Sequence, residues 1–93
     1  MKVFISQCMA GKTNEEIILE RSLLVSKLEN KGYQVIDSVL NIDANPVYLL
    51  GKSIELLSEA NFIYLMPGWE NGRGCRIEKL VADNYEIPIL EEV

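Results

Sequence analysis

The chain has 93 residues, of which 48% are hydrophobic and 25% are charged, and its formal net charge at neutral pH is −5. This length allows one domain, since a single core commonly takes about 100 residues, and the composition is that of a globular protein and not of a disordered or fibrous one. The 14 acidic side chains outnumber the 9 basic ones, which are scattered along the chain, so duplex nucleic acid is not the expected ligand.

The first predicted strand covers residues 2–6, where the sequence alternates and is rich in β-branched and aromatic side chains. Thr13 and Glu16 have the spacing of a capping box, in which each side chain accepts a hydrogen bond from the other residue's amide, and this starts a helix. The helix is expected to end near Lys31, before Gly32 in a left-handed conformation. Its expected apolar stripe consists of Ile17, Leu24 and Leu28, with Leu23 and Val25 beside it.

The second predicted strand covers residues 33–37. Asn45 followed by Pro46 is typical of a helix start, because asparagine caps the free amides and proline suits the first helical position. The expected buried face of this second helix consists of Val47, Leu50, Ile54 and Leu57. Residues 62–66 then form an unbroken apolar run, which indicates a central strand covered on both faces.

A third helix is predicted over residues 74–84 and a fourth strand over residues 87–90, with Pro88 near its start or on an edge. Alternation of strands and helices predicts an α/β fold with three layers, α/β/α. We expect a four-stranded parallel sheet in the order 2-1-3-4, as in flavodoxin-like or Rossmann-like folds. In that order the loops after the first and third strands, residues 6–13 and 66–75, face each other across a crevice where such folds bind ligands.

Other protein classes are disfavoured by the same sequence. No apolar run approaches the ~20 residues of a membrane-spanning helix, and the first residues lack a signal-peptide pattern, so we expect a cytoplasmic protein without a membrane partner. The two cysteines, Cys8 and Cys75, occur without any histidine, which gives neither a zinc-ligand spacing nor a disulfide framework. We therefore expect free thiols, no metal and no cofactor.

Residues 6–13 differ from the phosphate-binding loop of nucleoside triphosphatases only by Ser6 in place of its first glycine. No aspartate follows the 62–66 strand to hold magnesium, and the chain is short for that fold, so this interpretation is disfavoured. Two interpretations stay open. The amides at the start of the Thr13 helix could bind a single phosphate or carboxylate, or the segment is simply a capped helix with Lys12 in solvent.

Glu78 is the candidate catalytic residue, about one turn inside the third helix, whose amino end faces the crevice. There the helix dipole favours an ionised carboxylate, which would be a charged nucleophile or base at neutral pH. Equally, acidic residues near helix starts are common for stability alone. Arg73 and Arg76 could orient an anionic substrate or form surface pairs with Glu70 or Glu78.

Two further residues near Glu78 have open roles. Trp69 could stack on a base, or it could be a packing or subunit-contact residue. Cys75 is not expected to be the nucleophile, because the chain has no histidine to act as its base.

Two segments, QCMAGKT-x-E-E at the first loop and PGWENGRGCRIE-x-x-x-A at the second, resemble the nucleoside 2-deoxyribosyltransferase-like superfamily, in particular a small branch common in phages and prophages. The likeness spans almost the whole chain and implies a single domain over residues 1–93. In that branch the first loop generally reads Q-P-M-x-G-K, so Cys8 stands where proline is usual. The second motif is close to W-E-x-x-R-G-C-x-x-E, and the matching residues here are Trp69, Glu70, Arg73, Gly74, Cys75 and Glu78.

In the enzymes of this superfamily a G-T-x-x-E stretch supplies a glutamate nucleophile, and residues 74–78 fall on it with cysteine in place of threonine. The resemblance therefore implies an N-glycosidic-bond enzyme, a transferase or a hydrolase, in which Glu78 attacks C1′ of a deoxynucleoside or its monophosphate. The residues that would bind this substrate are Arg73, Arg76 and Lys12 for a phosphate, Gly11 and Gly74 for close approach, Gln7 and Trp69 for sugar or base, and Met9 in the first loop.

The sequence departs from the superfamily pattern where aspartates commonly help to protonate the departing base: it has Gly72 and residues 67–68, Pro-Gly, at those places. Glu70 or Asp37 could substitute as the general acid. Because of this gap, the alternative is a non-catalytic nucleotide-binding or sensing module with the same crevice. A third possibility is an interaction protein whose Trp69 loop builds a subunit interface. Short chains with exposed sheet edges, and members of this superfamily, commonly assemble, so we expect a homodimer or a higher homo-oligomer.

Overall fold

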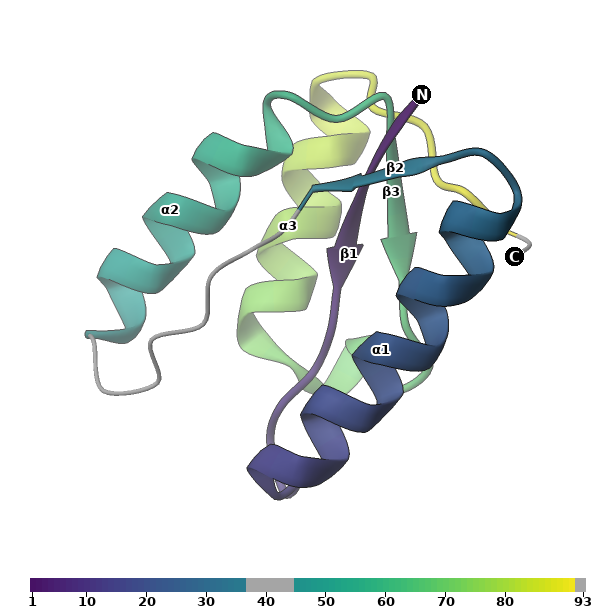
Figure 1. Cartoon of the computed structure of the whole chain (residues 1–93). Helices are drawn as coiled ribbons and strands as arrows, with labels where there is room; N and C mark the ends of the chain where they lie inside the picture. The colour runs from purple at the N-terminus through teal and green to yellow at the C-terminus, as the bar shows by residue number, and fades with distance from the viewer. Residues whose placement is uncertain (37–44, 92–93) are drawn as a thin grey trace.

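The computed structural model describes residues 1–36 and 45–91 (Figure 1). The elements in chain order are β1 (Lys2–Ser6), α1 (Asn14–Asn30), β2 (Gln34–Ile36), α2 (Pro46–Leu57), β3 (Phe62–Leu65), the 3-10 turn η1 (Trp69–Asn71) and α3 (Arg73–Asn84). The three strands form a parallel sheet in the order β2-β1-β3, so β1 is the central strand. The predicted α/β class and the relative order of these three strands are confirmed.

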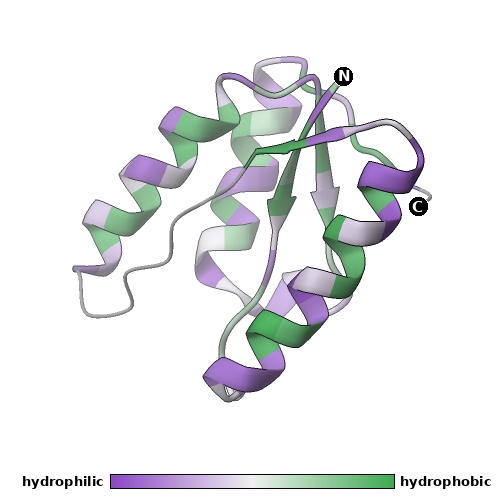
Figure 2. Ribbon diagram, viewed as in Figure 1, coloured by the Kyte–Doolittle hydropathy of each residue, from purple (hydrophilic) through white to green (hydrophobic). Residues whose placement is uncertain are grey.

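The helices cover both faces of the sheet, with α1 on one face and α2 and α3 on the other (Figure 1). Alternate side chains of β1 supply the two cores. Val3 and Ile5 pack with Leu28 of α1, whereas Phe4 packs with Leu57 of α2. Because successive side chains of a strand point to opposite faces, this apolar strand is buried on both sides. Figure 2 shows the corresponding hydrophobic segments along β1 and along the turns of α1.

The prediction of a fourth strand over residues 87–90 is wrong. Ile89 forms one isolated parallel bridge with Ile63 of β3, made by a hydrogen bond from the Ile63 amide to the Pro88 carbonyl and one from the Leu90 amide to the Ile63 carbonyl. Pro88 has no N–H to extend a ladder, and Glu86 just before it has a φ of 62° that turns the chain. Over residues 1–36 and 45–91 the sheet therefore has three strands, and β3, which we expected to be central, is its outer strand.

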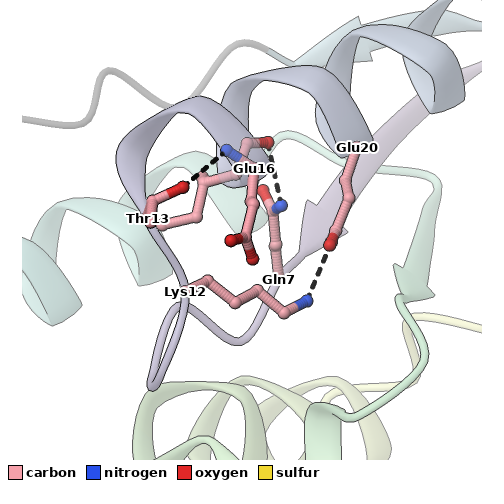
Figure 3. Close-up of polar contacts among 6 residues, drawn as sticks. Gln7, Lys12, Thr13, Glu16 and Glu20 are labelled. Atoms are coloured by element: carbon pink, nitrogen blue, oxygen red, sulfur yellow. Dashed lines mark hydrogen bonds and ion pairs between the residues drawn. The ribbon is translucent and has the colours of Figure 1, made fainter.

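Helix α1 begins as the sequence predicts, since the Thr13 Oγ1 accepts a hydrogen bond from the Glu16 amide at 3.1 Å (Figure 3). Gly32 follows the helix with a φ of 89°, which is the left-handed conformation expected there. The predicted stripe of Ile17, Leu24 and Leu28 is buried. Leu23, placed beside that stripe, is instead 60% exposed, because it lies about 100° around the helix from Leu24 and points away from the sheet.

Helix α2 also begins as predicted, with the Asn45 Oδ1 accepting a hydrogen bond from the Val47 amide at 2.8 Å. Its burial differs from the prediction at the first turn, where Val47 is 76% exposed. The reason is that only the C-terminal half of α2 packs on the sheet, through Ile54 and the fully buried Leu57. The predicted second strand is confirmed over Gln34–Ile36, while Asp37 and the polar segment after it lie outside the described residues.

None of the helices in the described part of the chain is long and apolar enough to cross a membrane.

Candidate functional site

Glu78 is a buried carboxyl group, with only 7% of its surface exposed. Helix α3 begins at Arg73, so Glu78 lies in its second turn and not in its first. One carboxyl oxygen, Oε1, accepts a hydrogen bond from the Ser6 hydroxyl at 2.6 Å. Ser6 is the last residue of β1 and is itself 1% exposed, so this contact joins the carboxyl end of the central strand to α3.

Burial raises the pKa of Glu78 above the ordinary value for a glutamate, and hydrogen bonds from Ser6 and Ser53, together with the positive charge of Arg21, oppose this rise only in part. Burial therefore outweighs the stabilisation of the ionised form that we expected from the helix dipole. The dipole acts mainly within the first turn, and the loss of solvent around a buried carboxylate outweighs it. When ionised, Glu78 is consequently a stronger base and nucleophile than an exposed glutamate.

A cavity of about 320 Å³ lies against Glu78. Three segments line it: the loop after β1, one face of α2, and the start of α3 with the residues just before it. The lining residues are Gln7, Cys8, Met9 and Ala10, then Pro46, Leu49, Leu50 and Ser53, then residues 71–75 and Glu78. The predicted crevice between the first and third loops is thus present, and α2 adds a third wall that the sequence analysis did not anticipate.

Five of the nine residues proposed from the sequence line this cavity. They are Gln7, Met9, Arg73, Gly74 and Glu78. The other four, Gly11, Lys12, Trp69 and Arg76, lie outside the cavity lining in the described structure.

Each of these four residues has a different setting. Lys12 forms an ion pair with Glu20 of α1, Nζ to Oε2 at 2.8 Å, so it is not the solvated lysine of the simpler interpretation (Figure 3). Arg76 donates from Nη1 to the Glu70 carbonyl at 3.2 Å. Trp69 lies beneath Lys79, whose Nζ is 5.7 Å from the ring centroid. Gly11 has a φ of 75° at the tip of its turn.

Gln7 presents an acceptor atom without a partner among the described residues. Its Nε2 donates to the Ile17 carbonyl at 3.1 Å, which fixes the side chain against α1, while its Oε1 is buried and makes no hydrogen bond there (Figure 3). Leaving a buried acceptor unpaired costs roughly 1–3 kcal/mol. The hydrogen bond to Ile17 thus holds the Gln7 amide on the α1 side of the first loop.

The two cysteines meet at Gly72, immediately before α3. A Cβ added at Gly72 would lie 3.1 Å from the Cys75 Sγ, 3.2 Å from the Cys8 Cβ and 3.3 Å from the Cys8 Sγ. Any side chain at position 72 would therefore crowd both cysteines. Burial raises the pKa of the Cys75 thiol, although a hydrogen bond with Ser6 opposes this. Both cysteines are free thiols.

Sequence reasoning missed Ser6 and Ser53, the two hydroxyl groups that hydrogen-bond to Glu78. The sequence could have indicated Ser53, because its helical spacing from Pro46, Leu49 and Leu50 places all four residues on one face of α2. Of the two candidate general acids, Glu70 lies on η1 with an exposed side chain, and Asp37 is outside the described residues. Across residues 1–36 and 45–91, no three His, Cys, Asp or Glu side chains are grouped to hold a metal ion.

Residues 1–91 match the sequence profile of a family described as a domain of unknown function, DUF4406. No curated protein and no solved structure matches the chain. The matched segment contains every residue that lines the cavity, including Glu78. Because the match covers nearly the whole sequence, the chain belongs to the DUF4406 family.

Proposed function

We propose that this protein is an N-glycosidic-bond enzyme, related to the nucleoside 2-deoxyribosyltransferase-like superfamily, that acts on a deoxynucleoside or its monophosphate through Glu78. The observation that carries the proposal is a buried carboxyl group, held by Ser6 at 2.6 Å, on the wall of a cavity of about 320 Å³. Small-molecule sites commonly have volumes of about 300–1,000 Å³. The likeness of residues 74–78 to the nucleophile motif of that superfamily supports the same assignment.

In the proposed reaction a carboxylate oxygen of Glu78 bonds to C1′ of the sugar while the bond from C1′ to the base nitrogen breaks. The departing base takes the bonding electron pair and a proton. Water or a second base then displaces Glu78, which completes hydrolysis or transfer. Ser6 donates to Oε1, and Ser53 also hydrogen-bonds to the carboxyl group, so the two serines hold Glu78 in place for attack. Glu78 is the only carboxyl residue among the described residues that line the cavity, and Glu70 is exposed outside it, so the base takes its proton from water.

Arg73 is the cation best placed for a phosphate group on the substrate, because it lines the cavity. Lys12 and Arg76, the other two cations considered from the sequence, already contact Glu20 and the Glu70 carbonyl.

We expect purified protein to release free base from at least one member of a panel of deoxynucleosides and deoxynucleoside 5′-monophosphates. The measurement is chromatography of the reaction mixture at high enzyme concentration, with and without a second free base to separate transfer from hydrolysis. A ribonucleoside panel run in parallel tests the requirement for the deoxy sugar. Absence of free base and of exchanged product over the whole panel would count against the enzyme.

The alternative is a non-catalytic nucleotide-binding or sensing module, and the missing aspartates near residues 67–72 favour it. Calorimetry with the same panel separates the two functions. Tight binding of a nucleotide that is recovered unchanged would support the module, particularly if Glu78→Gln binds it equally well. Weak binding accompanied by slow release of base would support the enzyme.

We also propose that the protein is a homodimer that covers the outer face of α1. Ile18, Leu19 and Leu23 on that helix are each at least 60% exposed, which leaves an apolar surface in contact with water. Sedimentation at micromolar concentration should show a dimer, and Leu19→Glu should shift it toward monomer. Leu80→Glu, on α3 with similar exposure, is the matched control and should stay dimeric. A dimer disrupted by Trp69→Ala but not by Leu19→Glu would place the interface at η1 instead.

A further inference from the structure

Cys8 and Cys75 come from opposite walls of the cavity and approach the same point in space. Cys8 follows β1, Cys75 lies in the first turn of α3, and their exposed fractions are 7% and 4%. Their sulfur atoms lie 3.3 Å and 3.1 Å from the position of a Cβ on Gly72. The separation of the two sulfurs therefore cannot exceed the sum of these two distances.

A disulfide needs the two sulfurs about 2 Å apart, so both must move toward each other. Moving χ1 of one cysteine between staggered positions displaces its sulfur by about 3 Å, and doing so for both residues displaces two sulfurs. Gly72, the residue between them, has no side chain to obstruct such a movement. The two positions are far apart in sequence, so the fold alone creates this pair.

We propose that Cys8 and Cys75 are a reversible oxidation site, which closes to an intramolecular disulfide when hydrogen peroxide enters the cavity. This inference goes beyond the proposed function and does not rest on it. Both thiols are buried from bulk solvent but line a cavity of about 320 Å³, which admits a small neutral oxidant. A bulky oxidant such as oxidised glutathione has no comparable access.

The oxidation proceeds in two steps, in which atoms, electrons and charge are conserved. Because burial raises the pKa of Cys75, Cys8 reacts first: its thiolate attacks an oxygen of hydrogen peroxide, the O–O bond breaks, and a sulfenic acid and hydroxide form. The Cys75 sulfur then attacks the sulfenic sulfur, its proton goes to the departing hydroxide, and the S–O bond breaks as the S–S bond forms. Overall, two thiols lose two electrons and two protons, one peroxide is reduced, and two waters are produced.

A bond between positions 8 and 75 has two physical consequences. It restricts the unfolded chain by closing a long loop, which raises the melting temperature. It also fixes the loop after β1 to the start of α3, next to Glu78, and so locks two of the three walls of the cavity. Oxidation would then restrict access to the cavity by narrowing its opening.

The test uses the full chain, reduced, freed of reductant and treated with a small molar excess of hydrogen peroxide. Remaining thiols are alkylated with N-ethylmaleimide in denaturant, and the intact mass is measured. We expect a monomeric chain that has lost two hydrogen atoms, takes up no maleimide and gives a joined peptide containing Cys8 and Cys75. Dithiothreitol should restore both thiols, and the oxidised form should melt at least ~5 °C higher than the reduced form.

Cys8→Ser and Cys75→Ser are the matched variants. Each should gain oxygen at its remaining thiol instead of losing two hydrogens. Separate oxidation of both thiols to sulfinic acids in the wild-type chain, or cross-linking between chains only, would overturn the proposal. The wild-type mass decides the matter even if a variant fails to fold.

Discussion

Glu78→Gln should lower the rate of base release by at least about 1,000-fold and, at the same time, make the folded protein more stable at neutral pH. An amide cannot form the covalent bond to C1′, and losing a nucleophile removes most of the chemical rate. Glutamine keeps the shape of the side chain and an oxygen that can accept from Ser6. It also removes a carboxylate whose ionised form is disfavoured by burial.

The raised pKa of Glu78 also determines how the stability difference between Glu78→Gln and the wild-type protein depends on pH. The folded protein binds the proton more tightly than the unfolded chain, so the wild-type protein is favoured at low pH and loses this contribution as pH rises through the folded pKa. The stability advantage of Glu78→Gln should therefore be small below the ordinary glutamate pKa and should grow with pH above it. Thermal melts of both proteins across that range measure the difference.

Glu59→Gln is the matched control, because Glu59 is an exposed acid just beyond α2 and away from the cavity. It should leave base release unchanged and alter the free energy of unfolding by no more than about 0.5 kcal/mol at any pH. If Glu78→Gln kept wild-type turnover, Glu78 would not be the nucleophile. If it were less stable than wild type at neutral pH, burial would not be the dominant influence on this carboxyl group.

Gly72→Val should destabilise the protein by about 1–3 kcal/mol, the usual cost of forcing extra carbon atoms into a packed interior. The backbone is not the reason, since Gly72 has a φ of −96° and a ψ of 124°, which valine adopts readily. The added atoms would instead meet Cys8 and Cys75 at less than ordinary contact distance. Chemical denaturation measures the loss, with an unchanged m-value expected if the transition stays two-state.

Gly51→Ala supplies the comparison, because a Cβ at this exposed position in α2 would meet nothing within 4 Å among the described residues. Alanine favours the helix over glycine, so this variant should gain about 0.5–1 kcal/mol. Equal effects of the two substitutions would show that the loop after β1 and the start of α3 separate easily, and that the packing around Gly72 contributes little.

Local signals in the sequence were sufficient for most of the fold. The caps at Thr13 and Asn45 correctly located two helix starts, and the apolar run at 62–66 located β3, which ends one residue earlier. The fourth strand was wrong because strand-like composition at residues 87–90 says nothing about whether Pro88 and the turn at Glu86 permit a ladder. Pairing is decided by hydrogen bonds between distant segments, which composition does not report.

The site was predictable in position but not in detail. Glu78 could be placed beside the first loop because the loops that follow parallel strands lie at the same edge of the sheet. In the structure Glu78 and that loop line one cavity. Its raised pKa was not predictable, because desolvation depends on how closely Ser6 and the surrounding atoms enclose the carboxyl group. The cavity wall made by α2 was not predictable either, because the sequence did not reveal which end of that helix packs on the sheet.

The uneven anchoring of α2 gives the cavity walls of unequal stiffness. The walls built from β1 and α3 are joined by the hydrogen bond between Ser6 and Glu78. Most of the α2 wall precedes the part of that helix that packs on the sheet, its first turn leaves Val47 in water, and of the described residues only Ser53 links it to Glu78. A ligand larger than the empty space would therefore be accommodated by outward tilting of α2. The side of the pocket that carries Glu78 would keep its geometry, and the range of ligands that fit would be set on the opposite side.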